Sequence, residues 1–168
     1  MKKKSASHRE RTPVSGQLKL DKSFQPCASE PGDELYPNGI FIFNITRLMA
    51  FIEAYMDEFP VEPVELADIP DFGEEHLNED AVLAADPSRP ILLAEISPGR
   101  YNVIDGNHRV AKARREGAAS LPAVRVHCPQ HVPFLTTARG YVAYVEYWNS
   151  KLKDAIELTD GSSTGARG

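Results

Sequence analysis

Cysteine and long apolar runs are scarce in this sequence of 168 residues. Its two cysteines, Cys27 and Cys128, lie far apart and neither belongs to a CxxC pair, which argues against a disulfide scaffold and favours free thiols in a reducing compartment. No apolar run approaches the ~20 residues of a membrane-spanning helix. The basic start at residues 2–4 is followed by polar residues, so no signal peptide is predicted. We therefore expect a soluble cytoplasmic protein without membrane insertion.

Basic residues are also missing from one long stretch of the chain. Residues 48–88 contain twelve acidic residues and no Lys or Arg, whereas residues 100–125 contain six basic residues against two acidic ones. An anion-binding surface could therefore lie on the second half, although the solvated faces of two separate elements would give the same pattern. The net charge of −5 argues against a dedicated high-affinity binder of duplex DNA.

The chain is expected to form one domain at residues 17–158. A disordered basic arm is predicted at residues 1–16, and a disordered Gly/Ser-rich tail at residues 159–168. Three prolines interrupt residues 18–38, which predicts an irregular lead-in with a short strand at Gln17–Leu20.

Hydrophobic periodicity predicts the elements of the first half. A helix is expected at Ile45–Phe59, with Asn44 as its N-cap and Pro60 as its stop. Val61–Ile69, broken by Pro63, is typical of an edge strand, and Leu77–Ala85 of a short helix.

The second half is more regular. A β-hairpin is predicted from two strands, Pro90–Ile96 and Tyr101–Asp105, joined by a four-residue turn. A helix at His108–Glu116, a strand at Leu121–Val126 and a helix at Thr136–Ile156 follow. The predicted fold class is α+β with a small mixed sheet and flanking helices.

The run Asp105–Arg109 is the strongest candidate for a functional site. A strand that passes through Gly106 directly into a helix leaves the first N–H groups of that helix unpaired, and these donors with the helix dipole favour an anion. Arg109 offers a planar fork for phosphate oxygens, and Lys112 a point charge one turn later. His108 can donate to phosphate or move a proton near neutral pH.

The remaining residues of the run have two interpretations. Asp105 and Asn107 could orient a metal-bound water or a ribose hydroxyl. They could equally be an ordinary turn, since Asp-Gly and Gly-Asn are common turn dipeptides, Asn107 suits an N-cap, and Arg109 suits a solvated surface. The residues alone leave both interpretations open.

The stretch from Pro90 to Val126, with "YNVIDGNHRVAKARREG" followed by "LPAVRV", resembles the core of the ParB/sulfiredoxin superfamily. In that family a strand delivers a Gly-x-[His/Arg]-Arg box to a helix N-terminus that grips nucleotide phosphates. Gly106, His108 and Arg109 match the box. The resemblance implies a ParB/sulfiredoxin-like fold with a phosphate site between strand and helix.

Asn107 departs from the better-known members of that family. Sulfiredoxins have their catalytic cysteine at this place, and partitioning ParB proteins have an acidic residue there and a long helical DNA-binding region afterwards. The resemblance is therefore to small stand-alone members, for which nucleotide hydrolysis, nuclease or small-molecule kinase activity is implied. The layout, with "RPILLAEISPGRYNVIDGNHR" and "VEYWNSKLK", is also similar to Osa-type fertility-inhibition proteins of conjugative plasmids.

The leading hypothesis from this resemblance is Mg²⁺-assisted hydrolysis of ATP or another NTP, with cutting of DNA as a further activity. The alternative is a binding module without turnover, which holds a nucleotide or DNA phosphate and inhibits a partner such as a conjugation coupling protein. The residues given catalytic roles are His108, Arg109, Asp105, Glu65 and Asp68, with Glu65 and Asp68 also as Mg²⁺ ligands; those expected to contact the nucleotide phosphates are Gly106, Asn107, His108, Arg109, Lys112 and Arg89.

Two further features of the sequence are candidates for a site. Glu95, inside an apolar strand, is expected to face either solvent or a site. His127, Cys128 and His131 offer three zinc ligands at awkward spacing and no clear fourth, which favours a loop after the last strand over a metal site.

Overall fold

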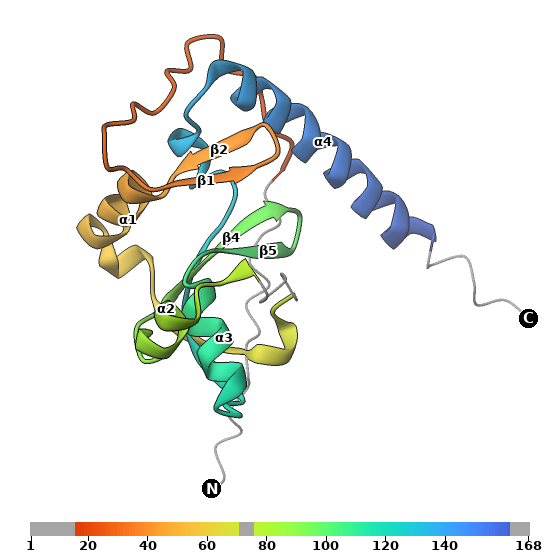
Figure 1. The fold of residues 1–168 in the computed structure, drawn as a ribbon. Coiled ribbons are helices and arrows are strands. Elements are labelled where there is room, and N and C mark those ends of the chain that lie inside the picture. Colours follow the sequence, from red (N-terminus) through yellow and green to blue (C-terminus); the bar gives the residue numbers. More distant parts are fainter. Residues whose placement is uncertain (1–15, 71–75, 162–168) are drawn as a thin grey trace, which may run out of the picture.

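The computed structural model describes residues 16–70 and 76–161, which form a mixed α+β fold (Figure 1). The predicted arm and tail lie outside these ranges, apart from their innermost residues. No helix in these ranges is long and apolar enough to cross a membrane. The strands are β1 (Leu35–Asn38), β2 (Phe41–Asn44), β3 (Val61–Glu65), β4 (Ile91–Ser97), β5 (Arg100–Asp105) and β6 (Ser120–Val126), and the helices are α1 (Ile45–Ala54), α2 (Glu79–Ala84), α3 (Asn107–Arg115) and α4 (Ala138–Gly161).

The larger sheet has the strand order β3-β6-β4-β5 and is mixed. β3 pairs antiparallel with β6, β4 pairs antiparallel with β5, and β4 runs parallel to β6. Every residue of β4 is buried, which explains why this strand is almost continuously apolar. β3 lies at the edge and carries Pro63, as predicted, because an edge strand tolerates a residue without an N–H donor. It ends at Glu65 rather than at the predicted Ile69, and residues 66–68 form a 3₁₀ turn.

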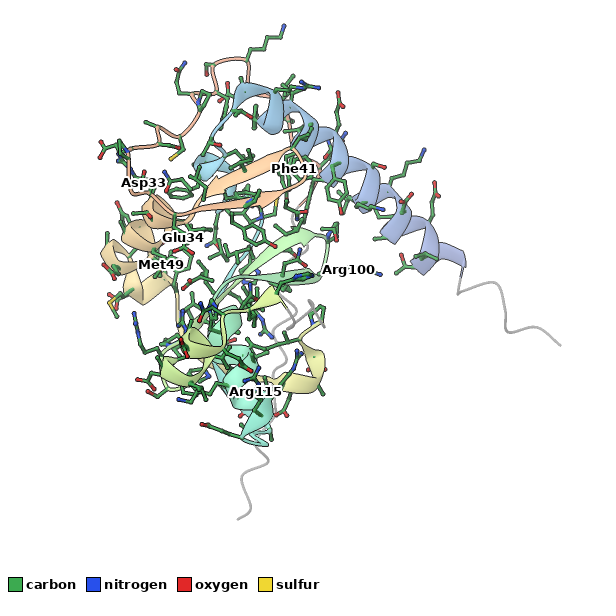
Figure 2. All side chains as sticks on the ribbon, in the orientation of Figure 1. Asp33, Glu34, Phe41, Met49, Arg100 and Arg115 are labelled. Atoms are coloured by element: carbon green, nitrogen blue, oxygen red, sulfur yellow. The ribbon has the colours of Figure 1, made fainter. Side chains whose placement is uncertain are left out.

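Alternate residues of β4 supply two cores, one on each face of the larger sheet. Leu92, Ala94 and Ile96 face α1, α4 and the β1–β2 hairpin, in what we call the α4-side core. Ile91 and Leu93 pack with α3 and the segment after β3, in what we call the α3-side core. The largest buried side chains of the α4-side core are those of Phe43, Ile45, Leu48, Leu135, Tyr144 and Trp148. Phe41 lies on the β1–β2 hairpin (Figure 2). Its ring meets that of Tyr144 on α4 edge to face, with 5.3 Å between the ring centres.

The predicted start of α1 is confirmed and its predicted end is wrong. The Asn44 side chain accepts a hydrogen bond from the Arg47 N–H, which is the expected N-cap. The helix ends at Ala54 rather than Phe59, because Tyr55 leaves the helical region with φ −126° and ψ 42°. A 3₁₀ turn at residues 56–58 then leads to Pro60.

Three further expectations are wrong. The segment Gln17–Leu20 is not a strand: its backbone bonds to side chains of α4, where Asn149 both donates to and accepts from Leu18, and the Trp148 indole donates to the Gly16 carbonyl. The structure also contains a β1–β2 hairpin inside and just after the predicted irregular lead-in. α4 continues beyond its predicted end at Ile156, to Gly161.

Candidate functional site

Gly106 forms the turn between β5 and α3 in the left-handed conformation, with φ 103° and ψ 21°. A Cβ atom built there would lie 2.7 Å from Cγ2 of Ile91, closer than side chains approach. Glycine is therefore required twice, by its backbone angle and by its packing against the first residue of β4. Both requirements hold without a ligand.

The first turn of α3 presents unpaired backbone donors. The Val110 N–H is the first to bond back, to the Gly106 carbonyl at 3.0 Å. Within residues 16–70 and 76–161, no oxygen accepts a hydrogen bond from the N–H groups of Asn107, His108 or Arg109. Three adjacent donors at the positive end of a helix dipole can hold an anion such as a phosphate.

Arg109 is directed at the protein's own oxygen atoms. Nη2 pairs with Oδ2 of Asp105 at 2.8 Å, and Nη1 donates to the carbonyls of Arg89 and Pro90. The side chains of Arg109 and Asp105 are only 14% and 17% exposed. The guanidinium thus ties the start of α3 to the start of β4, and a phosphate would compete with these acceptors.

Lys112 and Arg89 were also predicted to contact phosphate, and the structure gives each of them another role. The Lys112 ammonium donates to the carbonyls of Leu83 at 2.7 Å and Ala85 at 2.8 Å, where a cation satisfies the last carbonyls of α2. Arg89 is exposed, and its contribution to the turn is the carbonyl that accepts from Arg109.

Asn107 and His108 are the two side chains of the turn that the described protein does not engage. Asn107 is the first residue of α3 rather than its N-cap, and its Oδ1 atom is buried without a donor. An unmet buried acceptor is unfavourable, so this oxygen is suited to a donor from a ligand. The His108 imidazole is half-buried and makes no hydrogen bond to the described residues.

The structure does not bring Glu65 to this turn. Glu65 ends β3, where it pairs with Ser120, whereas Asp105 ends β5 at the opposite edge of the sheet. Three strand spacings separate these edges, or roughly 14 Å. Asp68 is exposed and lines a cavity beside the start of β5 instead. Among the described residues, the carboxylate at the turn is that of Asp105, and Arg109 neutralises it.

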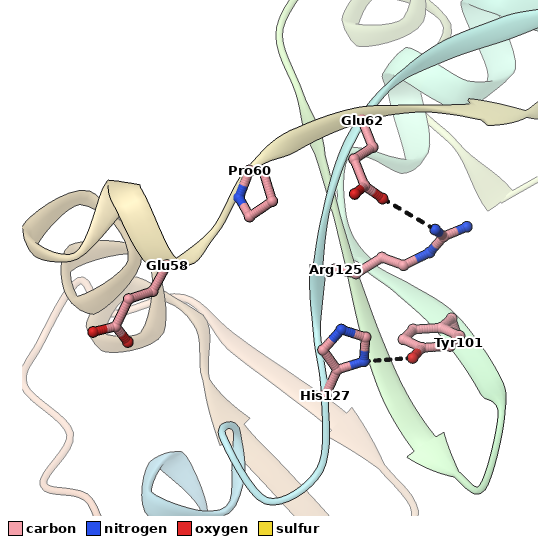
Figure 3. Close-up of a pocket in the computed structure, with 6 residues that line it drawn as sticks. All are labelled: Glu58, Pro60, Glu62, Tyr101, Arg125 and His127. Atoms are coloured by element: carbon pink, nitrogen blue, oxygen red, sulfur yellow. Dashed lines mark hydrogen bonds and ion pairs between the residues drawn. The ribbon is translucent and has the colours of Figure 1, made fainter. Parts of the chain in front are cut away.

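A second group of polar side chains, whose grouping the sequence did not predict, lies on the α3-side face of the sheet but away from α3 itself (Figure 3). Tyr101, Arg125 and His127 line a cavity of about 260 Å³ together with Glu58, Pro60 and Glu62. Tyr101 and Arg125 also line an adjoining cavity of about 450 Å³ over the buried Leu93. The Tyr101 hydroxyl lies 2.6 Å from Nδ1 of His127, and the Arg125 guanidinium lies 5.5 Å from the centre of the Tyr101 ring.

Hydrogen-bonding and charged side chains line these two cavities, which together we call the groove around Tyr101. Burial, and then the charge of Glu95, raise the pKa of Tyr101 to about 12, so the phenol keeps its proton in the hydrogen bond that it shares with His127. Arg125 has one long contact, 3.4 Å to a Glu62 oxygen, and its side chain is 39% exposed. The alternation of side chains along β6 is the sequence signal that could have found Arg125. It puts Arg125 on the same face as the buried Leu121 and Ala123.

The loop after β6 is held by a buried polar cluster. His131 donates from Nε2 to the Glu95 carbonyl, which leaves its buried Nδ1 without a donor, and burial lowers the pKa of His131 to about 4. The Glu95 carboxylate accepts the N–H groups of Gly99 at 3.0 Å and Cys128 at 3.1 Å. The expectation that Glu95 faces solvent or a site is therefore wrong, because two backbone donors satisfy it in the interior. Within the described ranges, no three His, Cys, Asp or Glu side chains are grouped to hold a metal ion.

Comparisons of the chain with protein-family models, with curated proteins and with solved structures found no match. A function is therefore inferred from the described residues themselves, above all from the free amides at the start of α3.

Proposed function

We propose that this protein is a binding module that holds the phosphate of a nucleotide at the N-terminus of α3. The observation that carries the proposal is the set of three adjacent N–H groups, on Asn107, His108 and Arg109, without an acceptor in the described chain. Beside these donors, the buried Asn107 oxygen offers an acceptor to a hydroxyl or amino group of the same nucleotide. A ParB/sulfiredoxin-like fold and a cytoplasmic location belong to the same proposal.

Binding is favoured over turnover because the charged side chains of the turn are already engaged. Hydrolysis of an NTP needs a carboxylate that positions water or Mg²⁺, and a cation that meets developing charge. Asp105 and Arg109 pair with each other, Lys112 bonds to α2, and Glu65 ends the opposite edge strand. The resemblance to plasmid fertility-inhibition proteins suggests that the occupied turn inhibits a partner, such as a conjugation coupling protein, or contacts DNA phosphate.

Hydrolysis of ATP or another NTP with Mg²⁺, with cutting of DNA as a further activity, is the second candidate. One observation favours it: the His108 imidazole is unengaged and stands next to the free amides, where it could act as acid or base. The two candidates differ in whether product forms.

The test is thermal unfolding and calorimetric titration with ATP, CTP, GTP and inorganic phosphate, each with and without Mg²⁺, combined with an assay for released phosphate. We expect at least one nucleotide to raise the Tm of the wild-type protein, because a ligand that binds only the folded state stabilises it. His108→Glu, which puts a carboxylate beside the amides, should lower affinity at least tenfold. Ala118→Glu adds the same charge on exposed chain beyond α3 and should bind normally.

His108→Ala separates the two candidates. It keeps the three amides, so the binding proposal predicts retained affinity and no product in either protein. Product formed by the wild type and lost in His108→Ala would establish the hydrolase instead. If neither nucleotides nor inorganic phosphate change the Tm at millimolar concentration, the phosphate-binding role is wrong.

A further inference from the structure

Helix α3 covers only part of its face of the larger sheet. Leu121 and Ala123 of β6 pack in the α3-side core, whereas Arg125 continues the same face of that strand and is exposed. The groove around Tyr101 lies on this uncovered part of the face. The site proposed for phosphate is at the other end of β5, since Tyr101 and Asp105 are about 13 Å apart along the strand.

All four strands of the sheet contribute side chains to the groove. β3 contributes Glu62, β6 Arg125, β4 Leu93 and β5 Tyr101. Arg125 lies on an inner strand and lines both cavities. The guanidinium is therefore at the centre of the groove, with Glu62 on one side and the Tyr101 ring on the other (Figure 3).

The Arg125 guanidinium has donors available for an anionic ligand. Its contact with a Glu62 oxygen is 3.4 Å long, whereas charge-assisted hydrogen bonds of this kind are about 2.7–2.9 Å long. A guanidinium suits a carboxylate, which can accept two parallel N–H bonds from it. Arg100, at the start of β5, brings a second guanidinium to the larger cavity and forms no ion pair with the described residues.

The β3 side of the larger cavity carries the opposite charge. Asp68 lies there, at the end of the 3₁₀ turn after β3, and its exposed carboxylate forms no ion pair with the part of the chain that the structure describes. The floor of the cavity is apolar, with the buried side chains of Val64, Ile69 and Leu93. Cationic groups, an anionic group and an apolar floor together match a molecule that carries both charges and an apolar body.

The Tyr101 ring is already ordered beside this floor. Its hydroxyl lies 2.6 Å from Nδ1 of His127, and the Arg125 guanidinium lies 5.5 Å from the ring centre. A ring that is held from both sides loses little side-chain entropy when a ligand binds. It offers an aromatic surface on which a second aromatic ring gains more than apolar burial alone.

We propose that the groove around Tyr101 binds a free aromatic α-amino acid. Arg125, helped by Arg100, binds the α-carboxylate, and Asp68 accepts from the α-ammonium. The aromatic side chain lies on Leu93 beside the Tyr101 ring. The cavity of about 450 Å³ falls within the range of roughly 300–1000 Å³ that is usual for small-molecule sites.

The acidic side chains of the groove favour this ligand over a nucleotide or a nucleic acid. Glu58, Glu62 and Asp68 line the two cavities. Carboxylates repel phosphate groups and attract an ammonium. The inference therefore concerns a different ligand from the one proposed for the start of α3.

Calorimetric titration of the full chain with L-phenylalanine tests the proposal. We expect a Kd below about 1 mM. L-Alanine should bind roughly tenfold more weakly or worse, because its methyl group leaves the apolar floor bare. 3-Phenylpropionate lacks the ammonium and phenethylamine lacks the carboxylate, so each should also lose roughly tenfold or more in affinity.

Two substitutions separate the roles of the charged side chains. Arg125→Gln should weaken the binding of L-phenylalanine and of 3-phenylpropionate, because both carry the carboxylate. Asp68→Asn should weaken only L-phenylalanine, because 3-phenylpropionate has no ammonium. Arg47→Gln on α1 and Asp154→Asn on α4 remove the same charges at exposed positions outside the groove and should bind normally. Circular dichroism verifies that each variant is folded.

The proposal is wrong if L-phenylalanine neither releases or absorbs heat nor raises the Tm at about 10 mM. Binding that Arg125→Gln leaves unchanged lies elsewhere on the molecule and also overturns it. Equal affinities for 3-phenylpropionate and L-phenylalanine would overturn the amino-acid class. His108→Glu lies outside the groove and should leave the binding of L-phenylalanine unchanged, so failure here and failure of the phosphate role are distinguishable.

Discussion

His131 shows how one buried residue sets a pH response. Its ring is fully buried between β4, α4 and the loop after β6, and Nε2 donates to the Glu95 carbonyl. Burial, and then the charge of His127, lower the pKa of His131 to about 4, whereas the carbonyl acts in the opposite direction. The neutral imidazole, with its proton on Nε2, is therefore part of the folded structure.

The free energy of unfolding should fall as the pH is lowered from 6.5 to about 4. In this window the unfolded chain, with an ordinary histidine pKa of 6.5, binds more protons than the folded protein, so the His131 contribution is complete above pH 6.5 and lost towards pH 4. The loss is at most about 3 kcal/mol. Urea unfolding at several pH values measures it, and His131→Gln, which keeps a donor for Glu95, should flatten the profile. An unchanged profile in that variant would assign the pH dependence to other groups.

The position of the candidate site was predictable at this scale, but the direction of its side chains was not. The spacing of Asp105 to Arg109 predicted a strand that turns into a helix, and that turn is confirmed. The engagement of Arg109 depends on the carbonyls of Arg89 and Pro90, which lie about twenty residues away in sequence. No local pattern shows which distant backbone oxygens will meet a guanidinium.

The basic side chains of helix α3 form hydrogen bonds to the neighbouring elements. Arg109 bonds to the start of β4, Lys112 to the end of α2, and Arg114 to the Ile69 carbonyl at 2.7 Å. A basic helix on the sheet resembles an anion-binding surface in sequence, whereas in the structure these three side chains satisfy carbonyl oxygens. The proposed phosphate site at α3 therefore depends on the backbone amides of the helix and not on these three side chains.

Arg109→Lys should lower the free energy of unfolding by about 1–3 kcal/mol, because an ammonium cannot serve Asp105 and two carbonyls in the geometry of a planar fork. Chemical denaturation measures this change. Arg47→Lys is the matched control, since Arg47 forms an exposed pair with Glu30 and should lose less than about 0.5 kcal/mol. Equal effects in the two variants would mean that the contacts of Arg109 with Asp105 and the two carbonyls do not stabilise the protein.

Long periodic elements were predicted well, and short paired ones were not. The β4–β5 hairpin, α3 and the start of α1 follow from alternation, glycine and capping. The strands β1 and β2 have four residues each and are joined at Gly39, so neither has a readable period of its own. The helical spacing of apolar residues in α4 continues past the part that packs on the core. The helix accordingly runs beyond its predicted end at Ile156.

At the scale of the whole molecule, β4 unites the two cores. Leu92 and Leu93 are neighbours in the chain and point into different cores, so neither core can lose β4 without affecting the other. We therefore expect the two cores to unfold together.

Leu93→Ala tests this coupling. It removes a buried side chain from the α3-side core and should cost roughly 2–5 kcal/mol. Trp148, the single tryptophan, reports only on the α4-side core. Its fluorescence transition in urea should shift to lower concentration by the same amount as the far-UV circular dichroism transition. A fluorescence midpoint that stays at the wild-type value would show two independent units.

The hydrogen bonds between Trp148 and Gly16, and between Asn149 and Leu18, join segments that the ribosome makes more than 120 residues apart. Leu18 and Phe24 also pack on the α4-side core, and the Phe24 ring stacks on Tyr141 at 3.9 Å. During synthesis the early segment must therefore wait for α4 to leave the exit tunnel, with its apolar side chains open to water or to chaperones. Nascent chains arrested before residue 138 should accordingly be sensitive to protease throughout the α4-side half, and protection should appear only after α4 has emerged.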